Sequence, residues 1–177
     1  MHSVELLLDH ATERAVREAW ERLARAGLPS LAAHRHPTNR PHLTLATADT
    51  LPAQTRAGLD HTLTAALPLS LTLDGLVRFG GRRHVLAWAV RPDDALLSLH
   101  RTVWRTLREA PGSGRPNPLH DPERWIPHIT LGRGAEHPGA AAGTEVLPLV
   151  PDTPLTGRWT GARTYDSLSR TTDRLGP

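Results

Sequence analysis

Hydrophobic residues recur along the chain with two periods, one typical of strands and one typical of helices. Short runs in which apolar residues alternate with polar ones, or follow one another directly, predict strands. We expect strands at 4–9, 42–47, 69–79, 85–90, 126–131 and 159–166. Apolar residues three and four positions apart predict amphipathic helices. We expect these at 12–26, 52–66 and 93–110.

Turn and capping residues mark the ends of these elements. Gly27 and Pro29 stop the first helical pattern, and Asp93 caps the third. The Gly80-Gly81 pair predicts a turn, so the strands on either side of it should form a hairpin. Residues 111–124 are rich in Pro, Gly and Arg and too numerous for a simple connection, so we expect them to form the rim or lid of a site.

Two segments have weak patterns. Residues 135–154 mix Ala, Gly and Pro without a clean period, which predicts a loop with at most one short element near Val146. Residues 169–177 are polar, and we expect them to fray.

The order of elements indicates an α+β fold with antiparallel sheets, because helices separate some strands whereas others form a hairpin. A chain of 177 residues with 38% hydrophobic residues is long enough to bury one proper core. We therefore expect a single domain over residues 1–177.

The most informative pattern is a five-residue string that occurs once in each half of the chain. The first copy is Pro41-His-Leu-Thr-Leu45 and the second is Pro127-His-Ile-Thr-Leu131. The bare His-x-Thr triplet means little, because it occurs five times. The full string is expected only about 0.02 times by chance at this composition, so two copies are a signal. Their positions suggest two similar lobes that face each other.

The other histidine pairs do not support a site. His100 and Thr102 fall within the third helix, where residues two apart point in different directions. His34 and His36 lie in a basic loop without a third ligand at a recognisable spacing, which favours an exposed loop over a metal site.

Each motif can present a rigid pair of polar side chains. On a strand, a histidine and the threonine two residues later share one face, while the residue between them packs on the other. If the two strands lie side by side or across a groove, four side chains converge: His42, Thr44, His128 and Thr130. One imidazole can then accept a proton while the other donates one, and the hydroxyls can hold phosphate oxygens. For either motif alone, ordinary strand residues are the simpler interpretation, but the repeated context favours phosphodiester cleavage without a metal.

The composition bears on the partners and the cellular compartment of the protein. All 21 basic residues are arginine, which lifts the pI to about 10.8 at a net charge of only +3. This usage reflects coding bias more than partner choice, with a mild leaning towards phosphate-bearing ligands. The chain has no cysteine, its start lacks the features of a signal peptide, and no apolar run approaches the ~20 residues of a membrane helix. We expect a cytoplasmic protein without disulfides and without a membrane segment.

The two motifs resemble those of the 2H phosphoesterases and, among them, the 2′,5′ RNA ligase or RNA 2′,3′-cyclic phosphodiesterase family. The resemblance is carried by residues 41–45 and by Trp125-Ile-Pro-His-Ile-Thr-Leu-Gly-Arg133, and the order of elements around them also fits. It implies a bilobal α+β domain made of two pseudo-symmetric lobes. Two antiparallel sheets with flanking helices would surround a central cleft that carries the two His-x-Thr strands.

The resemblance also implies a reaction and roles for site residues. The reaction is metal-independent hydrolysis of a 2′,3′-cyclic phosphodiester to a 2′-phosphate, with 2′,5′ RNA ligation as its reverse, and no cofactor. His42 would be the general acid and His128 the general base, while Thr44 and Thr130 would hold the phosphate.

Arg133 is a further phosphate-binding candidate from the same resemblance. Strict strand alternation puts Arg133 on the same face as Leu131, away from the cleft. A bend at Gly132 and Gly134 would be needed to bring it to the phosphate.

The expected partner is an RNA with a 2′,3′-cyclic phosphate end or a small cyclic nucleotide, bound by a monomer. One Phe and one Tyr leave few rings for base stacking. Trp125 shares the core face of Ile129, so we expect it to pack rather than to stack on a base. Two alternatives therefore stay open: a phosphodiesterase for a small non-RNA cyclic phosphate, and a non-catalytic module that binds RNA or nucleotides.

Overall fold

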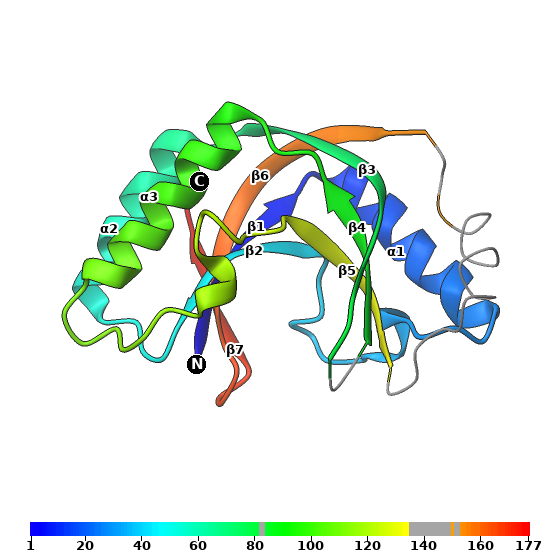
Figure 1. Ribbon diagram of the computed structural model, residues 1–177, viewed down its shortest axis with the longest axis horizontal. Helices are drawn as coiled ribbons and strands as arrows, with labels where there is room; N and C mark the ends of the chain where they lie inside the picture. The colour runs from blue at the N-terminus through cyan, green and yellow to red at the C-terminus, as the bar shows by residue number, and fades with distance from the viewer. Residues whose placement is uncertain (82–83, 135–149, 151–152) are drawn as a thin grey trace.

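The structure, a computed structural model, describes residues 1–81, 84–134, 150 and 153–177 (Figure 1). Its strands are β1 (His2–Leu8), β2 (His42–Ala48), β3 (Leu69–Phe79), β4 (His84–Val90), β5 (His128–Gly134), β6 (Leu155–Asp166) and β7 (Thr171–Leu175). Its helices are α1 (His10–Arg25), α2 (Ala53–Ala66) and α3 (Asp94–Glu109), with short 3-10 turns η1 (Leu31–Ala33) and η2 (Pro118–His120).

The three predicted helices are confirmed, and local chemistry explains where they begin. Asp9 accepts a hydrogen bond from the backbone N–H of Thr12 at 2.9 Å, and Asp93 accepts one from Leu96 at 2.8 Å. Each helix then buries the apolar stripe that its period predicts. Helices α2 and α3 lie together on one side of the molecule and α1 lies on the other (Figure 1).

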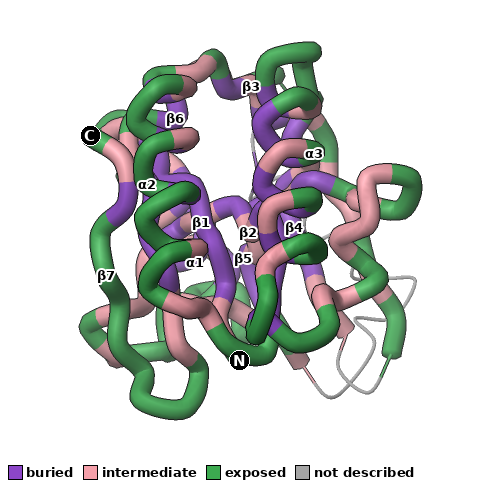
Figure 2. Tube along the Cα trace, turned by 90° about the vertical axis from the view of Figure 1, so that its left-hand side faces the viewer, coloured by how far each residue is buried: buried purple, intermediate pink, exposed green. Residues whose placement is uncertain are grey.

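The strands form one antiparallel sheet in the order β1-β2-β5-β4-β3-β6-β7, and β1 also pairs with β6. The α+β antiparallel fold predicted from the sequence is confirmed. The hydrogen-bonded ladder is continuous, so the two predicted sheets are parts of one sheet that closes on itself through β1 and β6. The strands carry many of the buried residues, as the purple stretches of the trace show (Figure 2).

Strands β2 and β5 share fewer paired positions than any other neighbours in this sheet. Only Leu43 and Ile129 are paired between them, whereas β1 pairs with β2 through six positions. The two motif strands therefore touch at one point and diverge from it. This geometry positions the site.

The start of the second motif strand differs slightly from the prediction. Strand β5 begins at His128 rather than at Ile126, because Pro127 has no N–H to donate to a ladder. The Pro127 carbonyl instead accepts a hydrogen bond from Val90 at 3.0 Å. Ile126 is left 52% exposed ahead of the strand.

The prediction that residues 169–177 fray is wrong. The chain turns back at Arg170, which has a φ of 56°, and residues 171–175 pair with β6 as β7. Leu175 is 1% exposed, and the N–H of Gly176 donates to Asp60 at 2.9 Å. A single buried leucine anchors the strand, which is too little for a hydrophobic pattern to show.

Residues 135–149 and 151–152 lie outside the described part of the chain. The short element expected near Val146 falls there, so it stays a prediction. In the described part, no helix is long and apolar enough to cross a membrane.

Candidate active site

The pairing of Leu43 with Ile129 brings the two motifs together. Both residues are buried in the core, so the motif residues on either side of them project to the opposite face of their strands. The antiparallel register puts His42 level with Thr130 and Thr44 level with His128. The structure therefore gathers all four motif side chains, each half-buried, on one face.

The two imidazoles are held in the same way. Nδ1 of His42 lies 2.6 Å from the carbonyl oxygen of Arg40, and Nδ1 of His128 lies 2.7 Å from that of Ile126. A carbonyl oxygen only accepts, so each Nδ1 carries a hydrogen and donates it. Each Nε2 is then the atom that gains or loses a proton.

Two tryptophans hold the backbones of the motif strands where the ladder ends. The indole N–H of Trp125 donates to the Thr44 carbonyl at 3.2 Å, and that of Trp20 donates to the Thr130 carbonyl at 3.0 Å. Buried carbonyls need a donor, and here the indoles supply it instead of a neighbouring strand. Trp125 also stacks on His100 at 3.7 Å between ring centroids and packs against the core, as the alternation predicts.

A bulge in β5 determines which face of the strand Arg133 occupies. Ala87 pairs with Thr130 and Leu86 pairs with Gly132, so Leu131 is an extra residue that shifts the alternation. Arg133 then lines the same pocket as His42 and Thr44.

Gly132, next to this bulge, is required by a close approach of two backbone segments. A Cβ at Gly132 would lie 1.9 Å from the Pro29 carbonyl oxygen, so only glycine allows the backbone to approach so closely.

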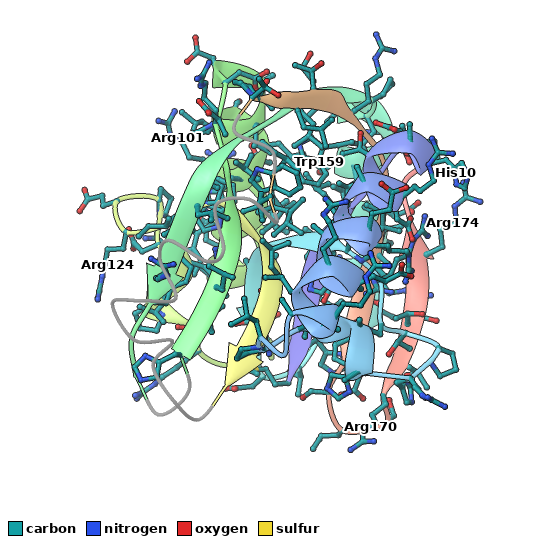
Figure 3. The ribbon with its side chains drawn as sticks, turned by 90° about the vertical axis from the view of Figure 1, so that its right-hand side faces the viewer. His10, Arg101, Arg124, Trp159, Arg170 and Arg174 are labelled. Atoms are coloured by element: carbon teal, nitrogen blue, oxygen red, sulfur yellow. The ribbon has the colours of Figure 1, made fainter. Side chains whose placement is uncertain are left out.

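A pocket of about 500 Å³ opens on the His42 side of the motif pair. Its walls come from β1, β2, β5, β6 and the loop after α1. Arg170, which Figure 3 labels at the β6–β7 turn, also lines it. His34 and His36, which the sequence assigns to an exposed loop, also line it. His128 and Thr130 lie beyond its boundary. In the described part of the chain, no three His, Asp or Glu side chains gather as a metal site would require.

Comparisons with known proteins agree with this geometry. A model of the 2′-5′ RNA ligase superfamily matches residues 12–164, a range that contains both motifs. The chain belongs to this superfamily. Its members are phosphoesterases of the 2H type, so the family resemblance seen in the sequence is confirmed. No curated protein sequence matches the chain.

Solved structures show the superfamily fold over nearly the whole chain. TT0787 of Thermus thermophilus is 19% identical, with a TM-score of 0.59 over 98% of this chain and 94% of that one. E. coli LigT in apo form is 20% identical, with a TM-score of 0.57 over 99% and 97%. LigT in complex with 3′-AMP is 20% identical, with a TM-score of 0.56 over 98% and 92%.

The environments of the two motif histidines in this superfamily member differ. Burial lowers the pKa of His128 below 6.5; the hydrogen bond to Ile126 opposes this, and the charges of Arg133 and His42 add to it. The His128 ring also contacts Phe79, with ring centroids 4.5 Å apart. His128 is therefore biased towards its neutral form.

Glu5 is a residue of the site that the sequence analysis missed. Its carboxylate is 2% exposed, and Oε1 lies 3.5 Å from Nε2 of His42. Nε of Arg163 donates to Oε2 at 2.7 Å. The available signal was a lone charged residue within the apolar run 4–8.

The long loop 111–124 lies beside the first motif strand, through its turn η2. His120 Nδ1 is 3.4 Å from the Thr47 hydroxyl, and burial, together with the charge of His128, lowers the pKa of His120 to about 4. That this loop forms the rim of a site stays a prediction.

His100 makes the stability of the protein sensitive to acid. It is 1% exposed, and burial lowers its pKa to about 4, although hydrogen bonds to the backbone of His120 and Leu45 oppose the shift. In the unfolded chain its pKa returns to about 6.5, so the unfolded state binds the proton first as the pH falls. The stability from this neutral ring is present above pH 6.5 and is lost towards pH 4.

We expect His100 to account for about 3 kcal/mol of the unfolding free energy lost between pH 7 and pH 4. Urea unfolding at the two pH values measures it. The His100→Phe variant, which keeps an aromatic ring against Trp125, should lose about 3 kcal/mol less than the unsubstituted protein over this range. His10→Gln, at an exposed helix start, should leave the loss unchanged. Equal losses in His100→Phe and the unsubstituted protein would contradict the prediction.

Proposed function

We propose that the protein hydrolyses a 2′,3′-cyclic phosphodiester, at an RNA end or in a nucleotide, to a 2′-phosphate without a metal. The observation that carries the proposal is the shared face of His42, Thr44, His128 and Thr130, with both Nδ1 atoms bound to carbonyls and both Nε2 atoms left for proton exchange. Two titratable groups placed in this way are more than a binding site needs.

The proposed reaction uses one histidine as acid and one as base. Nε2 of His128 accepts a proton from water, and the water oxygen attacks phosphorus. The bond from phosphorus to O3′ breaks, and Nε2 of His42 donates a proton to that oxygen. The products are a 2′-phosphate and a free 3′-hydroxyl. The same attack by an RNA 5′-hydroxyl in place of water gives a 2′,5′ linkage. This is the ligation from which the superfamily takes its name.

The hydroxyls of Thr44 and Thr130 would hold the non-bridging oxygens of the phosphate. Arg133 would add a charged donor, because the bulge in β5 turns it into the pocket beside Thr44. Solved structures of LigT in complex with phosphate, 3′-AMP, ATP and NADP+ support a phosphate-bearing ligand for this fold.

We also propose that the two motif strands belong to two pseudo-symmetric lobes of one domain. Two paired contacts support this: each catalytic histidine is bound to the carbonyl two residues before it, and each threonine carbonyl is bound by an indole. The protein would act in the cytoplasm as a monomer.

The pH dependence of turnover tests this proposal. We expect hydrolysis of a nucleoside 2′,3′-cyclic phosphate in excess EDTA, with a bell-shaped pH profile of kcat/KM. Because burial lowers the pKa of the proposed base His128, the acidic limb should lie below pH 6.5.

The outcomes separate the candidate functions. No turnover of any nucleoside 2′,3′-cyclic phosphate or RNA with that end, despite binding, favours a non-catalytic module. Turnover of the mononucleotide alone favours a small cyclic phosphate as substrate. Loss of activity in EDTA that zinc or magnesium restores would contradict the metal-independent mechanism.

A further inference from the structure

Glu5 stands out because it is a buried carboxylate in a pocket that should bind a phosphate. Among the described residues that line the pocket, it is the only carboxylate. A negative charge there repels an anionic substrate, and burial without partners would cost several kcal/mol. Pairs of this kind often add little to stability, since apolar replacements serve as well. The position of Glu5 therefore calls for a role beyond folding.

The strand register sets Glu5 between the first motif and β6. On β1 it pairs with Thr44 of β2 on one side and with Arg163 of β6 on the other. Its two oxygens have different neighbours. Arg163 binds Oε2, whereas the Ser3 hydroxyl donates to Oε1 at 2.7 Å, and Oε1 is also the oxygen that lies 3.5 Å from Nε2 of His42.

The carboxylate is ionised in this setting. Burial alone would raise the pKa of Glu5, but the charges of His42 and Arg163 and the hydrogen bonds from Ser3 and Arg163 lower it overall. The attraction between the carboxylate and a charged His42 is mutual. It favours a proton on Nε2, and at 3.5 Å the contact is too long to hold that proton in a strong hydrogen bond.

We propose that Glu5 is a positioning residue that keeps His42 protonated and so makes His42, rather than His128, the general acid. This inference rests on the proposed function of the two histidines. It explains why one acts as the acid and the other as the base. The carboxylate acts only through the charge on His42, whose Nε2 lies 3.5 Å from Oε1.

Other charged groups around His42 favour the neutral imidazole, so Glu5 has to act against them. Besides Glu5 and His42, the ionisable groups that share the pocket are the Met1 amino group, His2, His34, His36, Arg133, Arg163, Tyr165 and Arg170. His128 faces His42 from β5, and Arg40 lies next to it in the chain with its guanidinium bound to Glu13 at 2.7 Å. His128 has no carboxylate partner of its own in the described structure, and Arg133 disfavours its charged form.

The Glu5→Gln variant tests the proposal, because glutamine keeps the shape and removes the charge. We expect the alkaline limb of its kcat/KM profile, which reports the acid, to move down by about one pH unit. The acidic limb, which reports the base, should stay in place. A role limited to folding would lower activity at every pH without moving one limb alone. Asp74→Asn removes the carboxylate of the Asp74–Arg91 pair, outside this pocket, and should leave both limbs in place.

Glu5→Gln leaves Arg163 buried without its partner and could destabilise the protein. A double variant avoids this unpaired buried charge. In Glu5→Gln/Arg163→Gln both charges are gone and two amides can pair. The alkaline limb should again move down, but by less than in Glu5→Gln alone, because loss of the Arg163 charge partly offsets loss of the carboxylate. An alkaline limb that stays in place in the folded variants would overturn the proposal.

A second measurement needs no substrate. NMR titration of the histidine rings should show His42 taking up its proton at a pH about one unit lower in the Glu5 variants than in the unsubstituted protein. The same midpoint in both proteins would overturn the role of Glu5. If the unsubstituted protein has no activity, the proposed function fails, but the titration still decides whether Glu5 controls the charge on His42.

Discussion

Replacing either His42 or His128 with alanine is expected to lower kcat for a 2′,3′-cyclic phosphate by a factor on the order of 10² to 10⁴. Each ring supplies one proton transfer that water would otherwise have to make. The two losses should not add fully in the double variant, because the acid and the base act in the same step.

The structure supplies a matched control for this comparison. His10 begins another His-x-Thr triplet, but it is exposed at the start of α1 and does not line the pocket. His10→Ala should therefore keep the kcat of the unsubstituted protein. Thermal unfolding should confirm that all three variants are folded, and a folded His42→Ala or His128→Ala protein with unchanged turnover would remove that histidine from the mechanism.

The pH profiles of the two variants should also differ. His128→Ala removes the proposed base and should abolish the acidic limb, whereas His42→Ala removes the proposed acid and should abolish the alkaline limb. The opposite assignment would exchange the roles of the two histidines and contradict the inference about Glu5.

Local patterns were sufficient to predict most of the fold. Strong periodicity and the cap Asp93 placed three helices and six strands close to their observed positions. Strand β7 was missed because it has one buried apolar residue, Leu175, and depends on pairing with β6. Pairing of that kind is a tertiary property that a short polar segment does not reveal.

The repeated motif was sufficient to predict which four polar side chains share a face. The residues that contact them come from distant parts of the chain and could not be predicted in this way. Glu5 and Arg163 are 158 positions apart, and their ion pair follows from the β1–β6 register. The indole of Trp20 reaches Thr130 only after α1 packs on the sheet. Arg133 enters the pocket because of the bulge in β5, which strict alternation cannot show. Sequence patterns define faces of single strands, and these contacts join different elements.

The hydroxyls of the two motif threonines should contribute nearly as much as the histidines. Thr44→Val and Thr130→Val keep the branched shape that suits a strand and leave the backbone carbonyls bound by Trp125 and Trp20. Only the phosphate donor is lost. Each variant should lower kcat/KM by a factor on the order of 10² to 10³, as removal of one preorganised donor does elsewhere.

Thr102 provides the control, because it belongs to the His-x-Thr copy in α3, where its hydroxyl donates to the Ser98 carbonyl at 3.0 Å. Thr102→Val should keep full activity. Inorganic phosphate should inhibit Thr44→Val and Thr130→Val more weakly than it inhibits Thr102→Val, because the hydroxyls bind phosphate in the ground state as well. Lower kcat/KM with unchanged phosphate inhibition would assign the hydroxyls to the transition state alone, and unchanged values of both would exclude them from the phosphate site.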